Sequence, residues 1–91
     1  MKERRVAVEN SRGIHLRPSG IIAQALRGYT GIARVVTPDG TVNTITASPL
    51  SVMALSLAKD AVVTVQVEGP DEEKMLDTLC TLFARKYEYG K

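Results

Sequence analysis

Hydrophobic and polar positions predict strands in four segments of the chain. Alternation with a period of two is typical of a strand with one buried face, and it covers residues 2–9 and 62–68. Residues 32–37 and 41–45 are rich in β-branched side chains, and the segment between them, Pro38-Asp39-Gly40, has the residue types of a tight turn. These two segments are therefore predicted to form a β-hairpin.

The second strand of this hairpin is poorly phased. In a regular strand Val42 and Ile45 point to opposite faces, because side chains alternate from one residue to the next. A bulge would bring both onto one face.

Three further segments carry hydrophobic residues at helical spacings. The first begins at Leu16 and ends before Gly28, a residue suited to the position after a helix. The second is short and opens at Ser48 and Pro49, because serine is a favoured N-cap and proline a favoured first helical residue. Its predicted apolar face is formed by Leu50, Met53, Ala54 and Leu57.

The last helix is predicted from about residue 71 to residue 86. Acidic residues in its first turn and basic residues in its last suit the helix dipole at both ends: Asp71, Glu72, Glu73, Arg85 and Lys86. Its apolar stripe includes Cys80, which we interpret as a core residue and not as a catalytic thiol, because no helix start lies beside it. Residues 87–91 are expected to form a frayed tail.

The element order is thus β-α-β-β-α-β-α. Four strands with one apolar face, covered by three helices, predict an α+β fold: a two-layer, open-faced β-sandwich with an antiparallel sheet and all helices on one face. The other face of the sheet is expected to meet water. A chain of 91 residues with 44% hydrophobic and 24% charged residues is interpreted as a single domain, residues 1–91.

Composition excludes several classes of protein. The single cysteine excludes a disulfide scaffold, and no stretch approaches the roughly 18 apolar residues that span a bilayer. The first residues show no apolar signal core, so we expect a cytoplasmic protein without membrane insertion. Aromatic residues make up only 4% of the chain, and no basic cluster is interleaved with them, which argues against a nucleic-acid-binding module.

The charge is unevenly distributed. Residues 1–46 carry seven basic and three acidic side chains, whereas residues 47–91 carry five and seven. A basic first half favours an acidic partner or an anionic ligand, although ordinary solubility explains a charge of this size equally well.

The one histidine, His15, falls where the first helix is predicted to begin. A helix N-terminus offers unpaired N–H groups and a partial positive charge, which stabilise a bound anion. The same field disfavours the imidazolium form, so the ring keeps a lone pair for attack. Arg17 provides a guanidinium within reach of the same anion. These groups suit a phosphoryl group that is accepted on a ring nitrogen and released again. The alternative is a surface histidine that caps the helix and has no other role, which the flanking Gly13 and Arg17-Pro18 make less favoured. Nothing pairs with His15 to form a metal site or a triad.

The segment Gly13-Ile14-His15-Leu16-Arg17-Pro18-Ser19 resembles the active-site signature Gly-[Leu/Ile]-His-x-Arg-Pro-Ala of the HPr family, the histidine-containing phosphocarriers of the bacterial phosphoenolpyruvate:sugar phosphotransferase system. The segment 48–55 resembles the second helix of that family and its regulatory serine segment. The likeness extends over nearly the whole chain.

The resemblance implies a phosphocarrier that is a covalent intermediate and not itself an enzyme, with no cofactor or metal of its own. His15 would accept a phosphoryl group on Nδ1 from the phosphoenolpyruvate-dependent first enzyme of the system and pass it to IIA-type components. Arg17 and the helix-start amides would hold that group. Leu16, Gly20, Pro49, Leu50 and Met53 would form an apolar docking patch, and a protein that shares one face between successive partners is expected to be a monomer.

Ser48 matches the serine that a dedicated kinase, the HPr kinase/phosphorylase, modifies in many members of the family. A phosphate there would place negative charge beside the docking patch. The same residue is also explained as a plain helix N-cap.

The sequence departs from the family pattern at several positions. Ser19 stands in place of alanine, Leu16 is bulkier than the usual residue after the histidine, and Pro49 replaces an aliphatic residue after the serine. These departures leave open a second role within the family, a regulatory carrier of the nitrogen-related or signalling kind that is not coupled to sugar transport.

Overall fold

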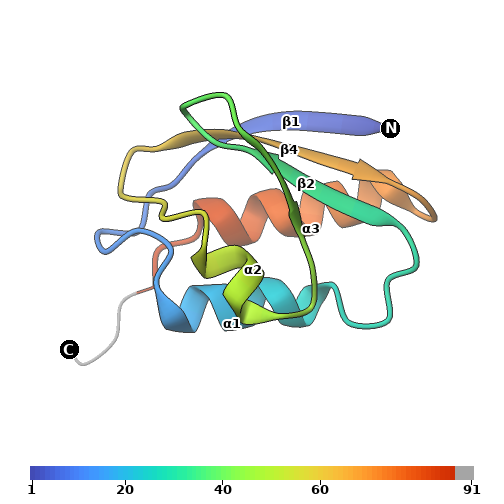
Figure 1. Cartoon of the computed structure of the whole chain (residues 1–91), viewed down its shortest axis with the longest axis horizontal. Helices are drawn as coiled ribbons and strands as arrows, with labels where there is room; N and C mark the ends of the chain where they lie inside the picture. Colours follow the sequence, from blue (N-terminus) through green and yellow to red (C-terminus); the bar gives the residue numbers. More distant parts are fainter. Residues whose placement is uncertain (88–91) are drawn as a thin grey trace.

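The computed structural model describes residues 1–87, and its elements follow the predicted order (Figure 1). The strands are β1 (Lys2–Ala7), β2 (Ile32–Val36), β3 (Val42–Ile45) and β4 (Val62–Glu68). The helices are α1 (Leu16–Ala25), α2 (Pro49–Met53) and α3 (Glu72–Ala84). The four strands form one antiparallel sheet in the order β1-β4-β2-β3.

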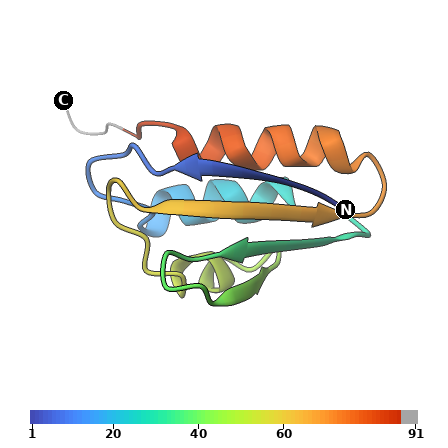
Figure 2. The same cartoon turned by 90° about the horizontal axis from the view of Figure 1, so that it is seen from above.

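All three helices cover one face of this sheet, as Figures 1 and 2 show. The alternation of valines in β4 explains why that face is buried. Val63, Val65 and Val67 are each at most 1% exposed, whereas the residues between them point to the open face. The core between the layers also contains Ile22 of α1 and Phe83 of α3, both fully buried. The predicted α+β open-faced sandwich is confirmed.

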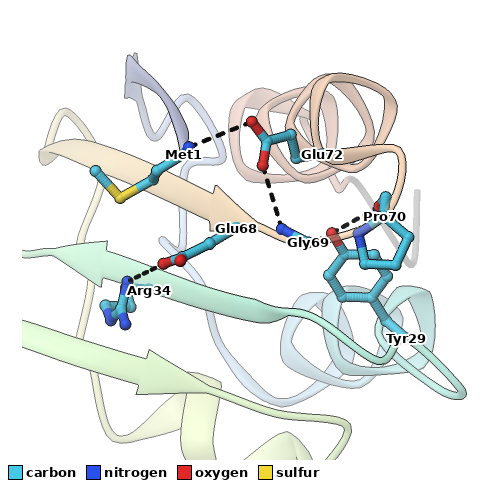
Figure 3. A network of polar contacts seen from close by, with 7 residues as sticks. All are labelled: Met1, Tyr29, Arg34, Glu68, Gly69, Pro70 and Glu72. Carbon is cyan, nitrogen blue, oxygen red and sulfur yellow. Dashed lines mark hydrogen bonds and ion pairs between the residues drawn. The ribbon is translucent and has the colours of Figure 1, made fainter.

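The helices bring distant segments to the same end of the molecule. α1 and α3 lie side by side and run in opposite directions, so the start of α1 lies near the end of α3 (Figures 1 and 2). At the opposite end, the Glu72 carboxylate accepts a hydrogen bond from the Gly69 N–H at 3.2 Å and lies 3.3 Å from the Met1 amino group (Figure 3). Tyr29 donates its hydroxyl to the Pro70 carbonyl at 2.8 Å. These contacts tie the end of β4 to the start of α3 and to the turn after α1.

The expected bulge in β3 is absent. The pairing of β2 with β3 is regular from Ala33 opposite Ile45 to Val36 opposite Val42. Val42 therefore lies on the open face and is 57% exposed, while Ile45 is buried. The sheet keeps its ladder hydrogen bonds and leaves one valine in water, which is the smaller cost.

The predicted apolar face of α2 is wrong in part. The helix ends at Met53, and Leu50 and Ala54 are exposed. The residues that reach the core here are Val52 in the helix and Leu55 and Leu57 in the segment after it. A helix this short has too few turns for periodicity to decide which side is buried.

The end of α3 also differs from the prediction. The helix stops at Ala84 with Arg85 as its C-cap, so the expected basic last turn is not formed. Tyr87, placed in the frayed tail from the sequence, is 6% exposed, and its hydroxyl donates to the Leu82 carbonyl at 2.6 Å. The rest of that predicted tail, residues 88–91, lies outside the described residues. Cys80 is in the core as expected, and burial raises the pKa of its thiol, which keeps it protonated.

Candidate functional site

His15 is the N-cap residue of α1, as the sequence predicted. Its backbone is extended, with φ −95° and ψ −161°, and its side chain makes no capping hydrogen bond. Within the first turn the Ser19 N–H donates to the His15 carbonyl at 2.9 Å. The preceding helical N–H groups, those of Leu16 and Arg17, have no intrahelical acceptor, since such bonds begin only after the first turn. A half-buried imidazole is thus placed at a helix N-terminus that it does not cap.

The loop before His15 is held in place by backbone and side-chain contacts. The Gly13 N–H donates to the Asn10 carbonyl at 2.9 Å, and the Ile14 N–H donates to the Leu57 carbonyl at 2.9 Å. Gly13 has φ +70°, and a Cβ there would collide with the Leu57 carbonyl. Only glycine fits this position, because it tolerates positive φ and needs no space for a side chain.

Asn10 is the polar anchor of the same loop. It is fully buried, its Nδ2 donates to the Gly13 carbonyl at 2.9 Å, and its Oδ1 accepts from the Tyr87 N–H at 2.6 Å. The segment after α3 is therefore bonded directly to the loop that carries His15. This role of Asn10 could not be predicted from the sequence, since nothing along the chain links residues 10 and 87.

Two polar atoms near the start of α1 lack partners. Within residues 1–87, His15 Nε2 and Ser19 Oγ are the buried side-chain polar atoms without a hydrogen bond. Ser19 is fully buried, whereas Arg17, two residues before it, is exposed.

Two helices contribute the five residues expected to form a docking patch. Leu16 is 66% exposed and Leu50 is 73% exposed, the two highest values among the large hydrophobic residues described. Pro49 is exposed, and Gly20 and Met53 are half-buried. α1 and α2 pack against each other, and Gly20 and Pro49 line one shallow depression between them. Leu16 and Leu50 are therefore surface residues and not part of the core.

Ser48 is exposed and has the extended backbone of an N-cap, but its side chain caps nothing. The hydroxyl of Ser51 instead joins the first turn of α2 to the segment before it: it donates to the Ser48 carbonyl at 2.7 Å and accepts from the Thr46 N–H at 2.9 Å. The Ser48 N–H in turn donates to Thr46 Oγ1 at 3.1 Å. The side-chain cap expected from Ser48 is therefore not formed, and hydrogen bonds among Thr46, Ser48 and Ser51 hold the turn that leads into α2.

The part of the chain that the structure describes contains no cluster of His, Cys, Asp and Glu suited to a metal ion. Across the same residues, no helix has both the length and the apolar character required to cross a bilayer.

An open-faced α+β domain whose one histidine lies at an uncapped helix N-terminus suits a small protein that carries a phosphoryl group. Comparison with known proteins supports this class. The sequence model described as "PTS HPr component phosphorylation site" matches residues 2–85. The chain therefore belongs to the HPr family of phosphocarrier proteins of the phosphotransferase system.

Curated relatives described as phosphocarrier protein HPr are similar over most of the chain. The phosphocarrier protein HPr of Mycoplasma pneumoniae is 33% identical over 79 residues, which cover 87% of this chain and 89% of the relative. The HPr of Treponema pallidum is 31% identical over 83 residues, covering 91% and 92%. Among solved structures, HPr-C-His from Thermoanaerobacter tengcongensis superimposes with a TM-score of 0.79 at 28% identity and covers 91% of each chain.

Proposed function

We propose that this protein accepts a phosphoryl group on His15 from the phosphoenolpyruvate-dependent first enzyme of the phosphotransferase system and passes it to IIA-type components in the cytoplasm. The observation that carries the proposal is the placement of His15: its imidazole stands at the N-terminus of α1 without capping it. The helix-start amides thus remain available for the oxygens of a phosphoryl group, and the helix field favours its negative charge.

The buried state of Nε2 supports Nδ1 as the attacking atom. His15 Nε2 is enclosed by the protein, so a phosphorus atom on a partner cannot reach it, which favours attack by the other ring nitrogen, Nδ1. The Nδ1 lone pair attacks phosphorus, the Nδ1–P bond forms, and the bond to the donor breaks with its electron pair remaining on the donor. Transfer to the acceptor repeats the step with the roles reversed.

Arg17 is proposed to position the phosphoryl group. It is the second residue of α1 and is exposed, two positions from His15. A guanidinium pairs with phosphoryl oxygens through two parallel N–H groups. Replacement by alanine is expected to slow transfer without unfolding the helix.

The docking patch is proposed as the surface shared by both partners. Leu16 and Leu50 present apolar side chains that contribute nothing to the core while exposed. A carrier must bind two partners in succession and release each quickly, which suits a small apolar surface and a monomer.

Ser48 is proposed as the regulatory phosphorylation site, used by a kinase of the HPr kinase/phosphorylase type. Its exposed hydroxyl is not engaged in capping the helix, so modification costs the fold no cap bond. A phosphate there adds about two negative charges beside Pro49 and Leu50 and repels an acidic partner. Ser48→Asp is therefore expected to impair phosphoryl acceptance at His15, whereas Ser48→Ala leaves acceptance unchanged.

The experiment is intact-mass spectrometry under mildly alkaline conditions after incubation with phosphoenolpyruvate and the first enzyme from the same organism. Wild type and His15→Ala are compared, with circular dichroism to show that both are folded. One acid-labile phosphoryl group on wild type alone is expected. Absence of transfer to folded wild type would contradict the proposal. Acceptance followed by transfer only to regulatory components would instead assign the chain to the regulatory branch of the family.

A further inference from the structure

The start of α1 contains a mismatch that the phosphocarrier role does not explain. Within the described residues, His15 Nε2 and Ser19 Oγ are the buried side-chain polar atoms left without a hydrogen bond. An unpaired buried polar atom costs free energy, so such atoms are usually paired in folded proteins. Here the two belong to the N-cap residue of α1 and to the residue four positions after it.

The backbone places these two residues on one side of the helix. The Ser19 N–H donates to the His15 carbonyl at 2.9 Å. This is the helical hydrogen bond between residues four positions apart, so Ser19 lies one turn after His15. Side chains four residues apart lie on one face and lean toward the N-terminus. Ser19 is fully buried beneath that face, so its hydroxyl has no access to water in place of a protein partner.

The chemistry of the two atoms is complementary. A serine hydroxyl both accepts and donates, and a neutral imidazole carries its proton on one nitrogen or the other. Rotation of the serine about its first side-chain torsion moves the hydroxyl between staggered positions at little cost. Within a helix the serine proton then has an acceptor in the carbonyl four residues earlier.

We propose that Ser19 is a positioning residue for His15: its Oγ accepts a hydrogen bond from Nε2–H and holds the imidazole in the tautomer whose Nδ1 lone pair is free. This inference rests on the proposed function, since it concerns the same nitrogen that attacks phosphorus. The bond persists after transfer, because Nε2 keeps its proton while Nδ1 carries the phosphoryl group. The bond to the resulting positively charged ring is charge-assisted and therefore stronger.

The test compares wild type with Ser19→Ala and with Ser11→Ala. Ser11 is an exposed serine in the turn before His15 and serves as the matched control. Ser19→Ala removes one buried oxygen and introduces a better helix former, so the variant is expected to fold. Thermal unfolding of all three proteins checks this.

The first readout is the tautomer of His15, measured by nitrogen-15 NMR in alkaline buffer where imidazole is neutral. Wild type and Ser11→Ala are expected to carry the proton on Nε2, with slow exchange of that proton with water. In Ser19→Ala the exchange is expected to accelerate roughly fivefold or more, the effect of losing one hydrogen bond. An Nδ1–H tautomer in wild type, or identical spectra for wild type and Ser19→Ala, would overturn the inference.

The second readout is the rate of phosphoryl acceptance. Ser19→Ala is expected to lower kcat about three- to tenfold with KM unchanged, because the docking patch is intact. If wild type accepts no phosphoryl group, the proposed function fails while the tautomer measurement still decides the role of Ser19. If wild type is active and Ser19→Ala matches it in both readouts, only the inference about Ser19 fails.

Discussion

Replacement of Leu50 by alanine tests whether the surface formed by α1 and α2 binds partners. Leu50 is 73% exposed and projects from a helix of five residues. Complete burial of a leucine side chain is worth about 1.5–3 kcal/mol. Because Leu50 is still largely exposed, roughly three-quarters of this free energy is gained only when a partner covers the side chain. An alanine at position 50 would keep a small part of that gain. The expected loss is about 1–1.5 kcal/mol, or roughly a tenfold rise in Kd.

The stability of the fold supplies an internal check. Because Leu50 contributes little to the core, the free energy of unfolding is expected to change by no more than about 0.5 kcal/mol. Binding and stability are thus predicted to separate, which a structural role for Leu50 would not allow.

Val42→Ala is the matched control, since Val42 is 57% exposed on the open face of the sheet, away from α1 and α2. Isothermal titration calorimetry measures Kd for the first enzyme and for a IIA component, and urea unfolding measures stability. Leu50→Ala is expected to weaken both complexes, and Val42→Ala neither. Equal effects of the two substitutions, or no effect of Leu50→Ala on either complex, would refute the reasoning.

Three further predictions concern stability. Ser51→Ala is expected to destabilise the fold by about 1 kcal/mol in urea unfolding, because it removes the hydrogen bonds that join the first turn of α2 to Thr46 and Ser48. Ser48→Ala is expected to change stability by only a few tenths of a kcal/mol, since its side chain caps nothing; the reverse order would show that Ser48 caps the helix. Asn10→Ala is expected to cost about 2–4 kcal/mol, since it leaves two buried groups unpaired, and a cost within 0.5 kcal/mol would exclude Asn10 as the anchor of the loop. The pKa of Glu72 is lowered, first by the hydrogen bond from the Gly69 N–H, so its contribution to stability is present above the ordinary glutamate pKa of about 4.3 and is lost as the pH falls through the lower folded value. Glu72→Gln is therefore expected to flatten the acid side of the stability profile, and an unchanged slope would contradict this.

The elements with long periodic patterns could be predicted from the sequence. The alternation of Val63, Val65 and Val67 determined which face of β4 is buried, because a strand has only two faces. The start of α1 at His15 followed from local residue types as well. Short elements were not predictable in the same way. α2 has five residues, and its exposed side was decided by packing against α1 and by the chain that follows it.

The candidate site residues likewise differ in whether local sequence could predict them. His15 and Arg17 could be chosen from the sequence as candidate site residues, because the proposed chemistry depends on neighbours within one helical turn. The role of Asn10 was not predictable, since it depends on Tyr87, a partner 77 positions away that only the fold brings near.

The sequence by itself determined the order of the elements, the residue that begins α1 and the family signature around it, because all three depend on local spacing and residue type. Only the tertiary structure decided that Leu16 and Leu50 remain in solvent, that Ser48 is free of the cap, and that Nε2 of His15 and the hydroxyl of Ser19 are enclosed without partners. The reason is that the exposure and the hydrogen bonding of a side chain depend on which residues, distant in sequence, pack against it. The local sequence pattern does not determine those contacts.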